Sequence, residues 1–172
     1  MSDPAQNRAA AGDASGADAE QYLTFQLAEQ EYGIDILRVQ EIKGWDKPTR
    51  IPQSPSHVLG VINLRGAVVP VIDLRTRFGL EPSTYGPTTV VIVARVRSDR
   101  GELTAGIVVD AVCEVCNVTP GDMRPAPEIG GAVDQDFVKG LAMAGERMLI
   151  LLNVDRLVNA RLLEGLGGAQ AA

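Results

Sequence analysis

The chain has 172 residues, which suffices for one ordinary domain or two very small ones. Hydrophobic residues make up 45% of it but aromatic residues only 4%, so Val, Ile and Leu must build the core, and β-branched residues favour strands. The net charge of −6 comes without a basic stripe, and the longest apolar runs are strand-sized, which argues against nucleic-acid binding and against direct membrane contact.

The N-terminal segment 1–20 consists mostly of Ala, Gly, Asp and Ser and has no apolar face, which predicts a disordered acidic tail. It has neither the basic start nor the apolar run of a signal peptide, so we expect a cytoplasmic protein. Residues 166–172 are mostly Gly and Ala and are expected to form a second, flexible tail.

Strands account for most of the sequence between the tails, because short apolar segments are separated by Pro, Gly and polar residues. The predicted strands are 22–27, 32–36, 39–42, 60–62, 67–74, 89–96, 103–109, 112–118 and 148–154. In the third strand we expect Val39 and Glu41 on one face and Gln40 and Ile42 on the other. Residues 155–164 are predicted to end the fold as a short amphipathic helix.

The second half of the sequence repeats the first. Four residues recur 73 positions later: Gly33, Ile34, Val39 and Glu41 return as Gly106, Ile107, Val112 and Glu114. Further matches recur 80 positions later, and the Pro/Gly-rich stretch 120–131 can absorb the difference as a loop. Short, evenly spaced strands predict small barrels or a sandwich, and the duplication predicts two packed barrels, at about 22–80 and 81–156, that bury a shared apolar seam.

One segment of the first copy, Asn63-Leu64-Arg65-Gly66, is not repeated, since the second copy reads Met143-Ala144-Gly145-Glu146. It joins two apolar strands at a barrel rim, and the Arg65 guanidinium is a planar fork of donors suited to a carboxylate. Its spacing leaves two readings open: a binding role, or an arginine that pairs with a nearby acid to hold the turn. Its absence from the second copy favours binding. For Glu41, the partner Glu114 favours a structural role, whereas closeness to the Arg65 turn would favour a role in a site.

The sequence offers no catalytic constellation, and we expect neither an enzyme nor a cofactor. Cys113 and Cys116 could be a redox pair or half of a zinc site, but a structural zinc site needs about four Cys or His ligands, and His57 lies far away in sequence. The two cysteines are also expected on opposite faces of one strand. A small-ligand-binding barrel is a third possibility, although the apolar content suffices only to fill two cores.

Several motifs together resemble the CheW-like domain family of chemotaxis adaptors. They are Tyr32-Gly-Ile-Asp-Ile-Leu-Arg-Val-Gln-Glu-Ile42, Gly60-Val-Ile-Asn-Leu-Arg-Gly66, Val69-Pro-Val-Ile-Asp-Leu74, Thr89-Val-Val-Ile-Val93, Gly106-Ile-Val-Val-Asp110, Arg124-Pro-Ala-Pro-Glu128 and Arg147-Met-Leu-Ile150. The resemblance assigns a CheW-like domain to residues 21–165. It implies two intertwined five-stranded SH3-like β-barrels around a shared hydrophobic core, a fold in which the first strand can be exchanged between the barrels.

The same resemblance implies a non-enzymatic adaptor that joins the regulatory domain of the histidine kinase CheA to the cytoplasmic tip of methyl-accepting chemoreceptors. Such a protein would be cytoplasmic and held at the inner membrane through receptor arrays. The residues implied in receptor binding are Val39, Glu41, Gly60, Asn63, Leu64, Arg65 and Val90. Those implied in kinase binding are Leu23 and Ile36, with a second contact through Arg124, Glu128 and Ile129. No metal site is implied.

Overall fold

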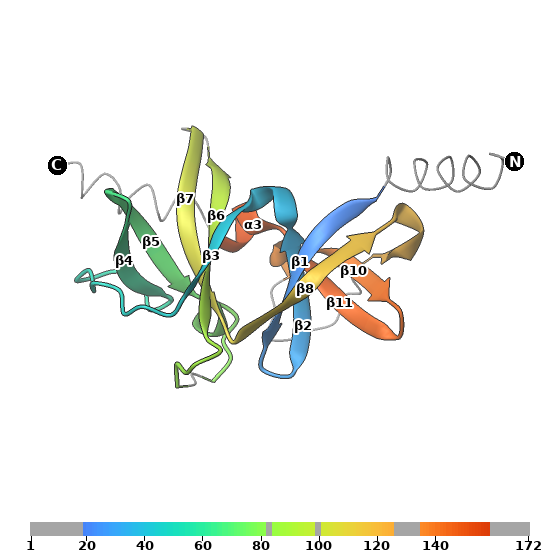
Figure 1. The fold of residues 1–172 in the computed structure, drawn as a ribbon, viewed down its shortest axis with the longest axis horizontal. Helices are drawn as coiled ribbons and strands as arrows, with labels where there is room; N and C mark the ends of the chain where they lie inside the picture. Colours follow the sequence, from blue (N-terminus) through green and yellow to red (C-terminus); the bar gives the residue numbers. More distant parts are fainter. Residues whose placement is uncertain (1–18, 82–83, 99–100, 126–134, 159–172) are drawn as a thin grey trace, which may run out of the picture.

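The structure, a computed structural model, describes residues 19–81, 84–98, 101–125 and 135–158 and is built almost entirely of short strands (Figure 1). The strands are β1 (Glu20–Leu27), β2 (Gln30–Asp35), β3 (Val39–Gly44), β4 (Val58–Leu64), β5 (Ala67–Asp73), β6 (Val90–Ser98), β7 (Gly101–Val109), β8 (Ala111–Val118), β9 (Met123–Arg124), β10 (Val138–Ala144) and β11 (Arg147–Leu152). The helical segments, in which η marks a 3-10 turn, are η1 (Ile36–Arg38), α2 (Leu74–Arg77), η2 (Pro120–Asp122), η3 (Gln135–Phe137) and α3 (Val154–Val158).

The predicted all-β fold is confirmed, with differences at the ends of elements. Ser98 still pairs with Gly101, so the β6–β7 hairpin is longer than expected. The helical turn α2 was not expected. It forms because the side chain of Asp73 caps it by accepting the backbone N–H of Arg75 at 3.0 Å. The helix expected at 155–164 begins at Val154, and its part beyond Val158 lies outside the described residues.

The strands form two sheets that do not divide the chain into contiguous halves. We call the sheet β8-β1-β2-β11-β10-β9 barrel A and the sheet β3-β6-β7-β5-β4 barrel B. The hairpin β1–β2 therefore joins strands of the second half, and the hairpin β6–β7 joins strands of the first half. The expected boundary near residue 80 is thus wrong, and the exchange between barrels involves a whole hairpin in each direction rather than the first strand alone.

The two barrels have equivalent strand orders, which explains the sequence repeat. The order β8-β1-β2-β11-β10 in barrel A corresponds to β3-β6-β7-β5-β4 in barrel B. Gly33 and Gly106 occupy equivalent positions where a parallel strand passes closely. A Cβ on Gly33 would lie 3.1 Å from the side chain of Leu151 on the parallel strand β11. One on Gly106 would lie 3.4 Å from that of Val71 on the parallel strand β5, and 2.8 Å from that of Val91 on the other neighbour, β6. The repeated glycines are therefore required by packing.

The apolar core has three parts, and the predicted shared core is the largest of them. Alternate residues of each strand face different parts. In β6, for example, Ile92 faces the shared core, while Val91 and Val93 face the interior of barrel B. The interior of barrel A is smaller and contains Tyr22, Cys116, Val118, Ala142, Leu149 and Leu151. Each barrel is thus stabilised by its own interior and by burial against the other.

Barrel B is closed by a backbone contact between its edge strand β4 and the loop that follows β3. Thr49 and Val61 exchange two backbone hydrogen bonds of 2.8 Å. Gly60, at φ +145°, lets the loop approach, because a Cβ there would lie 2.1 Å from the Thr49 carbonyl oxygen. Barrel A is closed in the same way, where the short strand β9 pairs with β10.

Two ion pairs hold the chain where it crosses between the barrels. The chain leaves barrel A at η1 and returns from barrel B at Asp110. Arg75 of α2 binds Asp110 in bidentate fashion, at 2.9 and 2.6 Å. Asp110 also accepts the backbone N–H of Ala28 in the β1–β2 turn, at 2.8 Å. This crossover clamp therefore ties α2, the crossover and the exchanged hairpin β1–β2 together.

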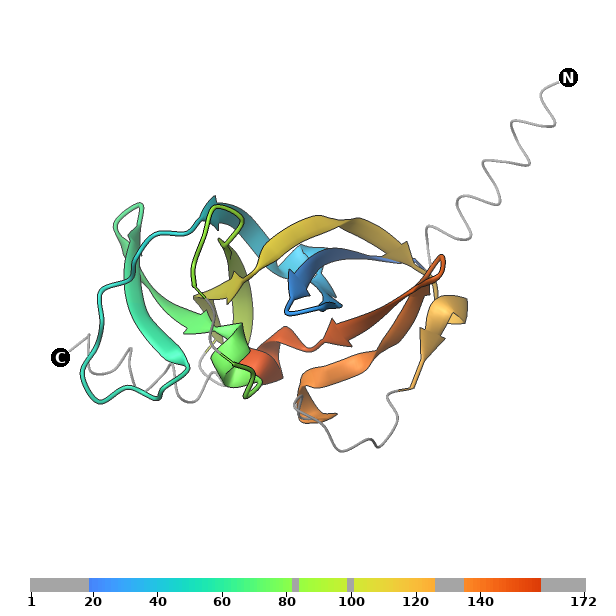
Figure 2. The same ribbon diagram turned by 90° about the horizontal axis from the view of Figure 1, so that it is seen from below.

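In a second crossover clamp the two charges are exchanged, so that the acid lies on the helix and the arginine on the crossover. Asp155 of α3 binds Arg38 of η1 in bidentate fashion, at 2.9 and 2.8 Å, and accepts the backbone N–H of Arg97 at 2.7 Å. Figure 2 shows α2 (green) and α3 (red) next to each other between the barrels, and Arg77 donates to the carbonyl of Leu157 at 2.9 Å. The two clamps and this contact fix one barrel against the other.

The first crossover clamp predicts a specific pH dependence of stability. Burial tends to raise the pKa of Asp110, but the Arg75 guanidinium and the Ala28 N–H outweigh it and lower that pKa. A lowered folded-state pKa stabilises the fold above the ordinary carboxyl pKa of about 3.9, and this stabilisation is lost as the pH falls through the lowered value. Asp110→Asn should therefore cost about 1–2 kcal/mol at pH 7, and the difference from the wild type should vanish in acid.

Urea unfolding at pH 7, 4 and below 3 measures this dependence. Asp46→Asn is the control, because Asp46 is exposed and forms no ion pair in the described part of the chain. A free-energy difference between wild type and Asp110→Asn that stays constant over this range would contradict a role for the ionised carboxylate.

Candidate functional site

The unrepeated segment forms a tight hairpin turn between β4 and β5. Leu64 pairs with Ala67, so Arg65 and Gly66 are the two turn residues, and their φ angles are +51° and +89°. Positive φ at both positions is typical of a type I′ turn, in which Asn-Gly is the favoured pair. The Asn63 side chain accepts the Gly66 N–H at 2.8 Å. Arg65 therefore adopts a left-handed conformation that costs an arginine about 1 kcal/mol.

The corresponding turn of barrel A has a different geometry. There Ala144 pairs with Arg147, and of the two turn residues only Gly145 has a positive φ, of +67°. The strained arginine is thus a feature of barrel B alone. Backbone strain is often found at functional sites, which makes the exposed Arg65 a candidate binding residue.

The guanidinium of Arg65 forms an ion pair with the carboxylate of Glu41 at 2.5 Å. The pair joins β3 and the turn after β4, the two edges of barrel B. The Arg65 side chain is 75% exposed, and that of Glu41 is 26% exposed. Both readings of the sequence thus find support: Arg65 does pair with a neighbouring acid, and most of its surface still faces solvent.

Barrel A contains an equivalent ion pair. Glu114 binds Arg147 at 2.8 Å, and Arg147 also binds Glu31 at 3.0 Å. The ion pair that joins the two barrel edges is therefore duplicated, although the turn sequence is not. The difference is that Arg147 is the first residue of a strand and is held by two acids, whereas Arg65 lies at the tip of a turn and is held by one.

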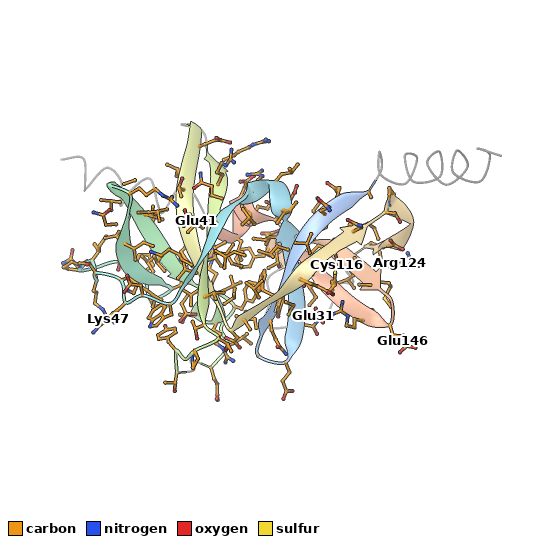
Figure 3. The ribbon with its side chains drawn as sticks, in the orientation of Figure 1. Glu31, Glu41, Lys47, Cys116, Arg124 and Glu146 are labelled. Atoms are coloured by element: carbon orange, nitrogen blue, oxygen red, sulfur yellow. The ribbon has the colours of Figure 1, made fainter. Side chains whose placement is uncertain are left out.

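The expected arrangement of side chains on β3 is wrong because the strand contains a β-bulge. Val39 pairs with Ala94 and Glu41 pairs with Val93, which are adjacent residues on β6. Adjacent strand residues face opposite sides, so Val39 and Glu41 do as well. Val39 packs against the shared core, while Glu41 lies at the rim of barrel B (Figure 3).

The residues implied in receptor binding are only partly brought together. Glu41, Asn63, Leu64 and Arg65 meet at one end of barrel B, and we call them the Arg65 rim. Gly60 is buried beneath Thr49. Val39 and Val90 both pack against the shared core, at opposite ends of the β3–β6 ladder.

The residues implied in kinase binding require one correction. Leu23 is 3% exposed and packs in the shared core, so it offers no contact surface. Ile36 is half-buried. The sequence reasoning missed Leu37, which is 78% exposed on the same turn. The sequence signal for Leu37 is that it directly follows Ile36 in a segment without the apolar alternation of a strand.

Arg124 is exposed on β9, at the far end of barrel A from Glu41 (Figure 3). Its guanidinium donates to the carbonyl oxygens of Gly121 and Met123, each at 2.9 Å. Glu128 and Ile129 lie outside the described residues.

The cysteines lack the environment of a reactive pair. Cys113 is exposed and Cys116 is buried. The expected placement on opposite faces of β8 is wrong, because a β-bulge lies between them: Val112 and Val115 pair with Phe25 and Leu23 on one face, so both cysteines lie on the other. Burial, followed by Glu31 for Cys113 and by Glu114 for Cys116, raises the pKa of both thiols. A raised pKa leaves less thiolate at neutral pH. In the described segments, no group of three or more His, Cys, Asp or Glu side chains is placed to hold a metal ion.

His57 is half-buried. Burial, with Arg77 as the second cause, lowers the pKa of its imidazole. Its backbone carbonyl accepts the N–H of Asp73 at 2.8 Å, so the residue joins the start of β4 to the end of β5.

Comparison with known proteins identifies the fold and the family. The model of the CheW-like domain matches residues 21–162. A chemotaxis protein CheW of Klebsiella aerogenes is 45% identical over 141 residues, which are 82% of this chain and 82% of that protein. A probable chemotaxis protein CheW of Rhizobium etli is 39% identical over 135 residues, covering 78% of this chain and 84% of the relative.

A solved structure has the same fold. The crystal structure of scaffolding protein TtCheW from Thermoanaerobacter tengcongensis superposes with a TM-score of 0.72 at 34% identity and covers 80% of this chain and 86% of that one. No helix in the described segments has the length and apolarity that crossing a bilayer requires. With a family model that spans the folded part and relatives of this identity and coverage, the chain belongs to the CheW-like domain family.

Proposed function

We propose that this chain is a non-enzymatic chemotaxis adaptor that couples methyl-accepting chemoreceptors to the histidine kinase CheA. The observation that carries the proposal is the match to the CheW-like domain across residues 21–162, with relatives of similar length named chemotaxis protein CheW. The related structure is described as a scaffolding protein. The ion pairs described above all join structural elements of the fold, in keeping with a scaffold rather than with catalysis.

The receptor is proposed to bind at the Arg65 rim. A guanidinium has five N–H donors, and the carboxylate of Glu41 can occupy only some of them. The rest are exposed on a turn whose position is fixed by Asn63 and Gly66. Leu64 supplies apolar surface beside the charge. Together these features fit the polar and apolar surface of a helical receptor tip. Gly60 fixes the position of β4, and Val39 and Val90 are proposed to contribute through the packing of β3 and β6 against the shared core.

The kinase is proposed to bind at two other places. Ile36 and the exposed Leu37 form the apolar contact, with Leu23 supporting them from the core. Arg124, Glu128 and Ile129 form a second contact at the far end of barrel A. Each contact can be modest, because an array presents many of them at once. The protein would then be cytoplasmic and held at the inner membrane through receptor arrays.

A reconstitution experiment tests the adaptor role. Receptor cytoplasmic fragments are anchored on vesicles and mixed with CheA, with and without this protein, and sedimentation and ATP-dependent phosphorylation are measured. We expect the protein to sediment with receptor-bearing vesicles and to raise kinase activity at least about tenfold, since it joins the two components. If the protein neither sediments with receptors nor changes kinase activity, the adaptor role is wrong.

A further inference from the structure

A trough runs along the outside of barrel B, at the end away from the Arg65 rim. One hollow of about 540 Å³ is lined by Trp45, Lys47, Pro48, Arg50, Leu59 and Tyr85. A second hollow, of about 340 Å³, follows the loop from Arg50 to Ser56 together with Val58 and Leu59. Because the hollows share Arg50 and Leu59, they form one elongated depression, which we call the Trp45 trough. Figure 3 places Lys47 at this lower end of the barrel, below Glu41.

The wall of the trough is a rigid aromatic platform. The rings of Trp45 and Tyr85 stack with centroids 4.0 Å apart and an interplanar angle of 19°. The Tyr85 hydroxyl donates to the Asp73 carboxylate at 2.6 Å, which fixes the ring to the start of α2. Both rings and Leu59 pack against the interior core of barrel B. The apolar surface is therefore held in place and not formed by mobile side chains.

The rim of the trough is positively charged. Lys47 and Arg50 are exposed, and neither forms an ion pair in the part of the chain that the structure describes. No acidic side chain lines either hollow. Two cations without an ion pair in the described segments thus lie beside an apolar platform, on a chain whose net charge is −6. They favour an anionic partner.

The trough belongs to one barrel only. Trp45 corresponds by the 73-residue offset to Val118, which is buried in barrel A, and Lys47 corresponds to Pro120. The closure of the barrel by the loop is duplicated, but the aromatic platform and the charges are not. The scaffold therefore does not require them.

We infer that the Trp45 trough binds an acidic, extended peptide segment of a partner protein. Apolar side chains of the peptide pack on Trp45, Tyr85 and Leu59, and its carboxylates pair with Lys47 and Arg50. An elongated depression with two cations at its rim suits a chain with several carboxylates better than a single small anion. This site goes beyond the adaptor role and does not depend on it.

The experiment uses the fluorescence of Trp45, which is the only tryptophan of the chain and therefore reports on the trough. The full-length protein is titrated with a blocked tetrapeptide, Asp-Leu-Glu-Leu, and with its neutral counterpart, Asn-Leu-Gln-Leu. We expect a saturable change in emission with the acidic peptide and at least about tenfold weaker binding of the neutral one. The affinity for the acidic peptide should fall as salt is raised.

Lys47→Glu/Arg50→Glu should weaken binding of the acidic peptide at least about tenfold. The matched control is Arg95→Glu/Arg97→Glu, which changes the net charge equally on two exposed arginines of barrel B. It should leave the affinity within about twofold, since those side chains lie outside the trough. The thermal midpoint of each variant shows that it is folded.

Three results would overturn the inference: equal binding of the acidic and neutral peptides, no saturable change, or an equal loss in both charge variants. Tighter saturation by phenylacetate than by the acidic peptide would also overturn it, because the trough would then bind small aromatic anions. Lys47→Glu/Arg50→Glu is expected to retain sedimentation with receptors, so failure of peptide binding leaves the adaptor proposal untouched.

Discussion

Replacing Arg65 with glutamate is expected to abolish receptor-dependent activation of the kinase while the protein stays folded. The substitution reverses the charge of the most exposed donor group at the Arg65 rim and places it beside Glu41. The turn itself is kept, because Gly66 and its hydrogen bond to Asn63 are unchanged. Loss of one exposed ion pair costs about 0–1 kcal/mol of stability, whereas receptor affinity should fall at least about tenfold.

Arg147→Glu is the matched control for this prediction. It breaks the equivalent ion pair of barrel A, with Glu114, and also the pair with Glu31. We expect it to lower the stability at least as much as Arg65→Glu does and to leave receptor binding within about twofold. Kinase activation and receptor sedimentation are measured for both variants. An Arg65→Glu protein that activates the kinase normally would refute the placement of the receptor site.

Gly60→Ala is expected to be the most destabilising of the substitutions considered. The new Cβ would lie 2.1 Å from the Thr49 carbonyl oxygen and 2.6 Å from its carbon, and both are backbone atoms that cannot rotate away. A φ of +145° is also unfavourable for alanine. The loop would have to separate from β4 and lose two backbone hydrogen bonds. We expect a loss of at least about 3 kcal/mol, which lowers the melting temperature by about 6–12 °C.

Gly44→Ala tests whether the effect is specific to Gly60. Gly44 also belongs to barrel B, but a Cβ there would meet no atom within 4 Å. Its stability should change by less than about 0.5 kcal/mol. Thermal unfolding of the two variants gives the comparison. Equal melting temperatures for Gly60→Ala and the wild type would show that the loop does not close the barrel through this contact.

The repeat made much of the fold predictable from the sequence. Gly33 and Gly106 share one offset because they face equivalent neighbours in two barrels of equivalent strand order. The alternation of apolar residues placed most strands, since each strand has two faces that meet different parts of the core. The exchange of hairpins was not predictable in this way. The sequence repeat is identical whether β1–β2 pairs with the first half or with the second.

Features that depend on a single local contact were also missed. The bulge in β3 moves Val39 and Glu41 to opposite faces, and nothing in the period-two pattern signals it. Burial of Leu23 follows from packing between the barrels, which a strand pattern does not show. The Trp45 trough joins a loop after β3 to a loop before β6, so its residues are about 40 positions apart in sequence. The folded chain brings Trp45 and Tyr85 together, where their rings stack.

The ion pair between Arg65 and Glu41 allows a direct test of whether Arg65 binds the receptor or only holds the turn. In the variant Glu41→Arg/Arg65→Glu the two charges are exchanged, so the ion pair across the barrel edges can form again. The measurement is sedimentation of this variant with receptor-bearing vesicles, beside wild type and Arg65→Glu. We expect stability to return towards the wild-type value while receptor binding remains lost. Restored binding would contradict the assignment, because Arg65 would then serve only as the partner of Glu41.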